Sequence, residues 1–193
     1  MKFYMKLQDW LAGPFSQKMQ KFMQNPYMHA LQVCFTIILP MIMVGSLASL
    51  VNTFRNFAPW LPDLSLINSF SFGLISIFMA FLIPYTIMES KKLQKQKMIT
   101  GFASVSALIA LANPQYVDGN LVINSGYVGT GGMTVAMVMG LVIGWLFSAY
   151  FKHGLFKKDS SLPSVVVVWF ESILIIFVLI LVCIIIGQNV DLF

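Results

Sequence analysis

Charged side chains are scarce in this sequence. Only 10% of its 193 residues are Asp, Glu, Lys or Arg, whereas 58% are hydrophobic. A soluble domain has roughly 25% charged residues, which it needs to cover a surface that faces water. The scarcity of charge therefore excludes a soluble globular fold and predicts that lipid surrounds most of the chain.

Cysteine and histidine are equally scarce, with two residues of each. Cys34 and Cys183 lie inside apolar segments without a cluster of further ligands, so we expect small buried residues rather than a disulfide or a metal site. His29 and His153 have no carboxylate or nucleophile beside them with which to form a catalytic pair. We therefore expect no catalytic residue, no metal and no other cofactor.

Nucleotide-binding motifs are absent as well. The glycine-rich segment 126–132 resembles a phosphate-binding loop, but no Lys-Ser or Lys-Thr follows it and no βαβ pattern surrounds it. We interpret it as a turn into the next helix. The formal net charge of +5 comes from lysines that flank apolar segments. Such lysines orient membrane helices and attract anionic lipid headgroups, so we do not expect nucleic acid as a partner.

What the sequence does contain is a series of five apolar segments. About 20 apolar residues cross the hydrocarbon core of a bilayer as a helix. We predict spans at 30–54, 67–88, 98–112, 133–151 and 165–186. The third segment is short, and it either crosses in a tilted orientation or does not fully cross. The prediction is one all-α polytopic membrane domain over residues 30–193, with five transmembrane helices.

The distribution of lysine and arginine predicts the orientation of these spans. Eleven of the twelve lie in the N-terminal arm, the second loop and the fourth loop, and only Arg55 lies in the first loop. Loops rich in Lys and Arg stay in the cytoplasm. We therefore expect a cytoplasmic N-terminus and an outer C-terminus. The polar stretch after the third span then lies outside, where residues 121–124 form either a short strand or a re-entrant piece.

Residues 1–29 form a separate N-terminal arm in this prediction. Aromatic and aliphatic residues recur there at spacings of three and four, with lysines between them. This pattern favours an amphipathic helix in the headgroup region, divided at Gly13-Pro14. The alternatives are a partner-binding helix or a disordered arm. The first apolar segment begins too far along the chain for a cleavable signal peptide.

Few residues are candidates for a functional site. Glu171 lies about 10 Å into the fifth span, where an acid is costly unless it faces protein or water. It is either a substrate or coupling contact, or a carboxylate near the inner interface that a lysine or water reaches. Asn113 and Asn124 are weaker candidates for a polar path. For helix packing we expect Gly45, in a small-residue stretch, and the GxxxG pair Gly140 and Gly144.

Three stretches of the sequence resemble one known family. These are LQDWLAGPFSQKMQKFMQNPYMHALQVCFTIILPMIMVGSLASLV, GYVGTGGMTVAMVMGLVIGWLFSAYF and SLPSVVVVWFESILI. They are similar to segments of enzyme IIC of the bacterial sugar phosphotransferase system, in the lactose, cellobiose and diacetylchitobiose branch. The third stretch has Ser164 where the family has a second proline, and it lacks the family's last proline.

The resemblance covers nearly all of this chain but only the N-terminal half of the family's chain. It implies an all-helical permease component in the bacterial cytoplasmic membrane, a homodimeric assembly, and enzyme IIB as the partner that phosphorylates a disaccharide. The family's sugar-contacting His and Glu lie in its C-terminal half, so no substrate-binding residue and no enzymatic activity are carried over to this chain.

The resemblance leaves three hypotheses open. The chain is the scaffold and dimerisation half of a permease whose second half comes from a separate chain, or it is a truncated relic of such a permease. Alternatively it is a stand-alone membrane scaffold or regulator, or an unrelated small transporter that acts as a homo-oligomer.

Overall fold

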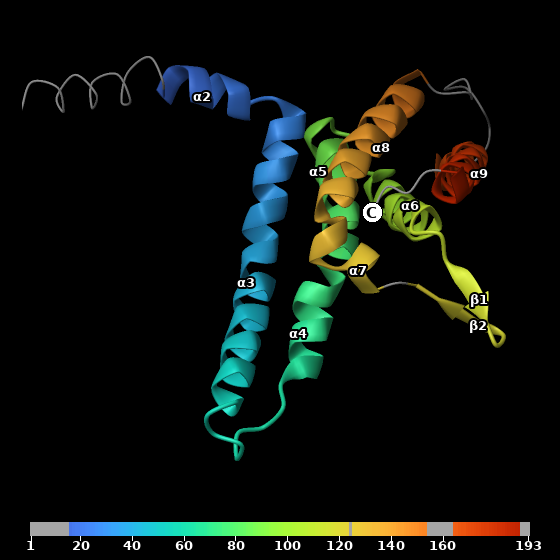
Figure 1. Ribbon diagram of the computed structural model, residues 1–193. Coiled ribbons are helices and arrows are strands. Elements are labelled where there is room, and N and C mark those ends of the chain that lie inside the picture. Colours follow the sequence, from blue (N-terminus) through green and yellow to red (C-terminus); the bar gives the residue numbers. More distant parts are fainter. Residues whose placement is uncertain (1–15, 124, 154–163, 190–193) are drawn as a thin grey trace, which may run out of the picture.

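The computed structural model describes residues 16–123, 125–153 and 164–189, most of which are α-helical (Figure 1). Four helices in this part of the chain are long and apolar enough to cross a membrane, namely Pro26–Arg55, Ser65–Ser90, Thr130–Lys152 and Val168–Asn189. An all-α membrane protein is therefore the fold class. Residues 1–15, which hold most of the predicted amphipathic arm, lie outside the described residues.

The N-terminal part consists of helix α2 (Ser16–Met23) and helix α3 (Pro26–Arg55). Asn25 starts α3, because its side-chain oxygen accepts a hydrogen bond of 3.0 Å from the backbone N–H of Tyr27. Pro26 suits the first turn, where its missing N–H leaves no bond unmade. In Figure 1, α2 turns away from the axis of α3. The predicted first span, 30–54, lies within α3.

The second predicted span is interrupted rather than continuous. It consists of α4 (Ser65–Ser71), the 3-10 turn η2 (Phe72–Leu74) and α5 (Ile75–Ser90). The hydroxyl of Ser71 donates to the Ile67 carbonyl at 2.7 Å, and such side-chain bonds compete with the regular helix. Gly73 adds a residue of poor helix propensity at the same place. These two residues explain the break that the hydropathy pattern did not reveal.

Helix α6 (Lys97–Leu111) is followed by a hairpin of β1 (Gln115–Val117) and β2 (Asn120–Val122). Asp118 and Gly119 form its turn with φ of 50° and 79°, as expected for a two-residue hairpin turn with both central residues left-handed. The hairpin lies between the third and fourth predicted spans, in the polar stretch for which a short strand was one of the two alternatives. The alternative of a short strand within 121–124 is correct for its first two residues.

The glycine-rich segment forms a folded-back connection into the next long helix. It contains α7 (Ser125–Val128) and η3 (Thr130–Gly132), and leads into α8 (Met133–His153). A Cβ on Gly131 would lie 2.8 Å from the Gly126 carbonyl oxygen, and one on Gly132 would overlap the Tyr127 carbonyl. Only glycine fits such a close backbone approach. Helix α9 (Ser164–Asn189) is the last element.

Helix α5 is the centre of the packing, and it contacts α3, α6 and α8. Its residues Met79, Ile83 and Ile87 are completely buried. Helix α8 runs parallel to α5, since Gly140 lies against Ile83 and Gly144 lies against Ile87. Helix α3 runs antiparallel to α5, because its start contacts the end of α5 and its later half contacts η2.

Helices α6 and α9 lie on the other side of α5 and are foreshortened in Figure 1, so they are inclined to α3. Lys97 at the start of α6 meets Glu89 near the end of α5. Gly101, one turn later in α6, lies against Phe81 further back in α5, which makes these helices antiparallel.

Helix α9 packs against α6, and a Cβ on Gly187 would lie 2.6 Å from the Leu111 carbonyl oxygen. The ends of α6 and α9 therefore meet. The Tyr150 hydroxyl near the end of α8 bonds to the Glu171 carbonyl early in α9, so α9 starts beside the end of α8 and runs in the same direction as α6.

Candidate functional site at the lysine-rich end

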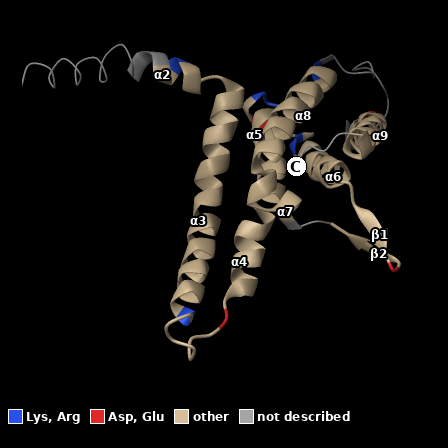
Figure 2. Cartoon of the chain, in the orientation of Figure 1, with Lys and Arg blue, Asp and Glu red and all other residues tan. Residues whose placement is uncertain are grey.

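Most of the described basic residues gather at one end of the molecule. Figure 2 shows them near α2, at the end of α5, near the start of α6 and at the end of α8, whereas one lies at the far end of α3. That one is Arg55, which forms an exposed ion pair of 2.9 Å with Asp63. We call the first region, where α5 and α8 end and α3 and α6 begin, the lysine-rich end.

Lys91 joins three helices at this end. Its Nζ atom donates to the Tyr27 hydroxyl of α3 and to the Ser148 hydroxyl of α8, both at 2.7 Å. The ammonium group also lies 4.7 Å from the centroid of the Tyr27 ring, within the range of a cation–π interaction. Beside it, Ser90 Oγ lies 3.4 Å from His29 Nδ1. The charge of Lys91 therefore holds α3, α5 and α8 together.

A second contact set ties α5 to α6. Lys97 Nζ lies 2.7 Å from Glu89 Oε1 and 4.8 Å from the centroid of the Tyr85 ring. The Tyr85 ring stacks on Phe81, one turn further into α5, with the centroids 5.7 Å apart. Aromatic side chains thus lead from the charged residues into the apolar part of α5.

Glu171 lies close to the same end, in the early turns of α9. Its side chain is buried, with 6% of the residue exposed, and its backbone carbonyl accepts a hydrogen bond of 3.2 Å from the Tyr150 hydroxyl of α8. Asn113 is exposed and follows the last turn of α6 with a left-handed φ of 47°. Asn124 lies outside the described residues.

These candidates do not come together at one site. Gly187 packs against the last turn of α6, two residues before Asn113. Glu171 is sixteen positions from Gly187, which corresponds to about 24 Å along α9. Glu171 and Asn113 therefore lie towards opposite ends of the molecule.

The three glycines considered for helix packing all lie at close approaches inside the chain. A Cβ on Gly45 would lie 2.5 Å from a ring carbon of Phe72 in η2. A Cβ on Gly140 would lie 3.1 Å from Ile83 Cβ, and one on Gly144 would lie 2.5 Å from Ile87 Cδ1. Both buried cysteines are free thiols, Cys34 in α3 and Cys183 in α9.

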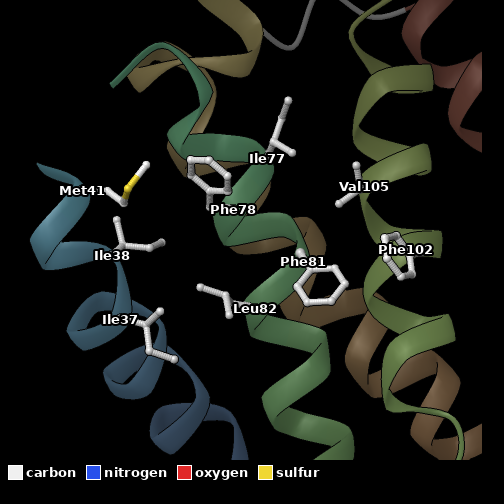
Figure 3. Close-up of a pocket in the computed structure, with 9 residues that line it drawn as sticks. All are labelled: Ile37, Ile38, Met41, Ile77, Phe78, Phe81, Leu82, Phe102 and Val105. Atoms are coloured by element: carbon white, nitrogen blue, oxygen red, sulfur yellow. The ribbon is translucent and has the colours of Figure 1, made fainter. Parts of the chain in front are cut away.

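Sequence reasoning missed an apolar groove of about 500 Å³ between α3 and α6 (Figure 3). Helix α5 forms its floor with Phe78, Phe81 and Leu82, α3 forms one wall, and Phe102 of α6 stands on the other. The signal in the sequence is the spacing of aromatic residues on one face of the second span. The hydrophobic periodicity of that span is weak, because α5 is apolar on every side. The sequence alone therefore does not show which face of α5 forms the groove.

The outer faces of the helices indicate what surrounds the chain. Large apolar residues such as Trp169 and Phe177 of α9 are 60% and 66% exposed, and α3 exposes a similar set. Apolar surface on this scale marks contact with lipid or with other proteins. Within the described residues, no group of three or more His, Cys, Asp or Glu side chains is arranged to hold a metal ion.

Comparison with known proteins assigns the family. The sequence matches the family model described as "Phosphotransferase system, EIIC" over residues 32–193, which is most of its length. The chain belongs to this EIIC family. An EIIC protein is the membrane component of a sugar phosphotransferase permease, and the exposed apolar helices of this EIIC chain agree with that location. No curated protein and no solved structure matches it.

Proposed function

We propose that this EIIC chain forms the N-terminal scaffold half of a permease for a disaccharide such as cellobiose or lactose. The observation that carries the proposal is the set of polar contacts at the lysine-rich end. Lys91 and Lys97 bond to groups on neighbouring helices, so their charges hold helices together. Such an arrangement suits a scaffold, and the sugar site then belongs to a complementary C-terminal half. The branch of the family rests on the three sequence stretches quoted above.

The proposal includes five crossings with the lysine-rich end in the cytoplasm. The contacts give α3, α6 and α9 one direction and α5 and α8 the other, which is the alternation that five crossings require. Helix α6 has 15 residues and a length of about 22 Å, shorter than the usual hydrocarbon core. Local thinning of the bilayer around a short helix costs little per ångström of mismatch.

The glycines and Glu171 take structural roles in this proposal. Gly140 and Gly144 let α8 approach α5, and Gly45 makes room for η2, as small residues do between membrane helices. Their neighbours belong to the same chain, so the homodimer contact that the family resemblance implies uses another surface. Glu171 belongs to the packed region beside Tyr150 rather than to a sugar path.

The test is co-expression with a complementary EIIC half, followed by co-purification in mild detergent and by measurement of disaccharide uptake. We expect a stable complex of defined stoichiometry, with uptake that depends on both chains and on enzyme IIB. Uptake by this chain alone would instead support a small independent transporter. Association with a full-length permease, without any uptake that requires this chain, would support a stand-alone scaffold or regulator.

A further inference from the structure

We propose that the groove between α3 and α6 binds one acyl chain of an acidic phospholipid, whose headgroup lies against the lysines of the turn between α5 and α6. This proposal goes beyond the permease function and does not depend on it. It rests on the composition of the groove, on the direction in which the groove leads, and on the charges at its end.

The lining of the groove is suited to hydrocarbon. All nine side chains that line its volume of about 500 Å³ are apolar, and none offers a hydrogen bond to a polar ligand. A cavity with such walls stays free of ordered water, because water needs polar partners. In a membrane, the surrounding medium that can fill the groove is hydrocarbon.

The size of the lining residues favours an acyl chain over a packed helix. Membrane helices associate closely where one of them presents small residues, as α8 does to α5 with Gly140 and Gly144. The groove has no such residue, because its walls and floor consist of Ile, Leu, Val, Met and Phe side chains. A flexible acyl chain adapts to this uneven surface, whereas the backbone of a helix is held away from it.

The groove leads to the lysine-rich end. Phe81 lines the groove, and its ring stacks on Tyr85, over which the ammonium group of Lys97 lies at 4.8 Å from the centroid. Phe102 meets Phe81 edge to face at 5.2 Å. A lipid whose acyl chain lies in the groove therefore has its headgroup beside the start of α6, at the depth where aromatic and basic residues meet the interface.

The charge at this end is positive. The turn carries Lys92 and Lys95, both exposed, in addition to Lys97 at the start of α6. Two additional lysines near the membrane surface correspond to a preference for an acidic over a zwitterionic headgroup of roughly thirty-fold. The occupant that matches both the groove and this charge is an acidic phospholipid.

The experiment is native mass spectrometry of the full chain, titrated with phosphatidylglycerol or with phosphatidylethanolamine. We expect the first phosphatidylglycerol to bind at least about tenfold more tightly than phosphatidylethanolamine. Leu82→Trp fills the floor of the groove and should weaken this first binding step at least about tenfold. The matched control is Ile173→Trp on the exposed face of α9, which should leave the binding unchanged.

The charge is tested separately with Lys92→Gln and Lys95→Gln in one variant, which should remove most of the preference for phosphatidylglycerol. Lys152→Gln, at the end of α8, is the control. Unchanged first binding in Leu82→Trp would overturn the proposal. Equal binding of the two lipids to the wild type would also overturn it, as would an unchanged preference in the double lysine variant. A loss of dimer mass in Leu82→Trp with lipid binding intact would overturn it too, and would assign the groove to a second copy of the chain.

A second measurement on the wild-type chain covers the case in which Leu82→Trp does not fold. Phosphatidylglycerol with a photoreactive group on its acyl chain is cross-linked to the protein, and the modified peptides are identified. The proposal requires modification concentrated on the groove residues of α3, α5 and α6, with competition by unlabelled phosphatidylglycerol. Modification spread evenly over α9 and the outer face of α8 would overturn it.

Discussion

At the scale of single residues, Gly144 is the most demanding position in the contact between α8 and α5. A Cβ there would lie 2.5 Å from Ile87 Cδ1 and 3.3 Å from the Pro84 backbone, so one neighbour must move. We expect Gly144→Leu to destabilise the chain by about 1–3 kcal/mol or more, as overpacking does. Thermal unfolding in detergent measures this effect as a lower midpoint.

Gly73→Ala is the matched control for the Gly144 variant. The nearest atom to a Cβ on Gly73 is Ser69 Cβ at 3.9 Å, an ordinary contact. We therefore expect no steric penalty, and the free energy of unfolding should stay near the wild-type value or rise by up to about 1 kcal/mol, because Ala has a higher helix propensity than Gly. Equal midpoints for Gly144→Leu and Gly73→Ala would show that α8 does not approach α5 at Gly144.

Lys91 and Tyr27 should be energetically coupled. Lys91→Met removes the donor that reaches both Tyr27 and Ser148, and hydrogen bonds to charged groups contribute about 1.5–3 kcal/mol. In a double-mutant cycle with Tyr27→Phe we expect a coupling of about 1 kcal/mol. The exposed Lys152 gives the control cycle, with Tyr27→Phe and Lys152→Met additive. Additivity in the Lys91 cycle as well would contradict the contact.

Asp63 should give the loop between α3 and α4 a dependence on pH. The backbone and side chain of Ser65 donate hydrogen bonds to its carboxylate, and with Arg55 nearby these lower its pKa below the ordinary value. A carboxyl group with a lowered pKa stabilises the folded state at pH values above the pKa of the unfolded chain. This stabilisation is lost as the pH falls through the lowered pKa.

The substitution Asp63→Asn tests this sign. We expect the variant to lose less stability than the wild type between pH 5 and pH 3, as measured by thermal unfolding across that range. A parallel pH dependence in both proteins would mean that Asp63 makes no such contribution. Because the pair with Arg55 is exposed, the effect should also decrease at high salt.

Residues differ in how far sequence alone reveals their roles. The four-residue spacing of Gly140 and Gly144 is visible in the sequence, and it drew attention to the face of α8 that the structure places on α5. The partners of Lys91 lie 64 and 57 positions away, and nothing local points to them. Long-range pairs depend on which helices become neighbours, and a single sequence does not provide that information.

At the scale of elements, a buried hydrogen bond joins the break before α5 to the break before α8. The hydroxyl of Ser76, completely buried at the start of α5, donates to the carbonyl of Gly129 between α7 and η3. We expect Ser76→Ala to cost about 1–3 kcal/mol, because it leaves a buried carbonyl without this donor. Hydrogen exchange of the amides in 125–132 should also become faster, since the segment loses its link to α5.

The control for Ser76 is Ser69→Ala in α4. Ser69 is exposed, and its hydroxyl bonds only to the Ser65 carbonyl within the same helix. It should change neither the unfolding midpoint nor the exchange in 125–132. If both variants exchange at the wild-type rate, the link between α5 and the α7 segment contributes nothing to stability.

The positions of long apolar helices were predictable, whereas their interruptions were not. Hydropathy places helices α3, α8 and α9 to within a few residues at most ends, because a span needs a long apolar run. The break at Ser71 depends on a side-chain bond that competes with the backbone, and hydropathy does not register it. Asp118-Gly119 is a turn signal in the sequence, but the strands on either side have only three residues each, too few for the apolar pattern to distinguish a strand from a re-entrant piece.

At the scale of the whole molecule, the number of crossings determines on which side the C-terminal end of α9 lies. The direction of each helix follows from its contacts: α3, α6 and α9 start at the lysine-rich end, and α5 and α8 end there. If that end is cytoplasmic, the β1–β2 hairpin and the end of α9 both lie outside. A segment α6 that did not cross would place the hairpin inside instead.

Cysteine labelling in intact cells separates these arrangements. Both native cysteines are buried, so a membrane-impermeant thiol reagent should report mainly on an introduced cysteine. We expect Asp118→Cys in the hairpin turn to react from outside and Lys92→Cys to react only after the cells are opened. A reporter fused after Phe193 should likewise behave as external. If Asp118→Cys is labelled from outside but the reporter is cytoplasmic, α9 does not cross the membrane. If Asp118→Cys is not labelled from outside, α6 does not cross it. Only the second result would reduce the chain to the four helices that are long enough to cross without thinning the bilayer, whereas the first would leave four crossings that include the short helix α6.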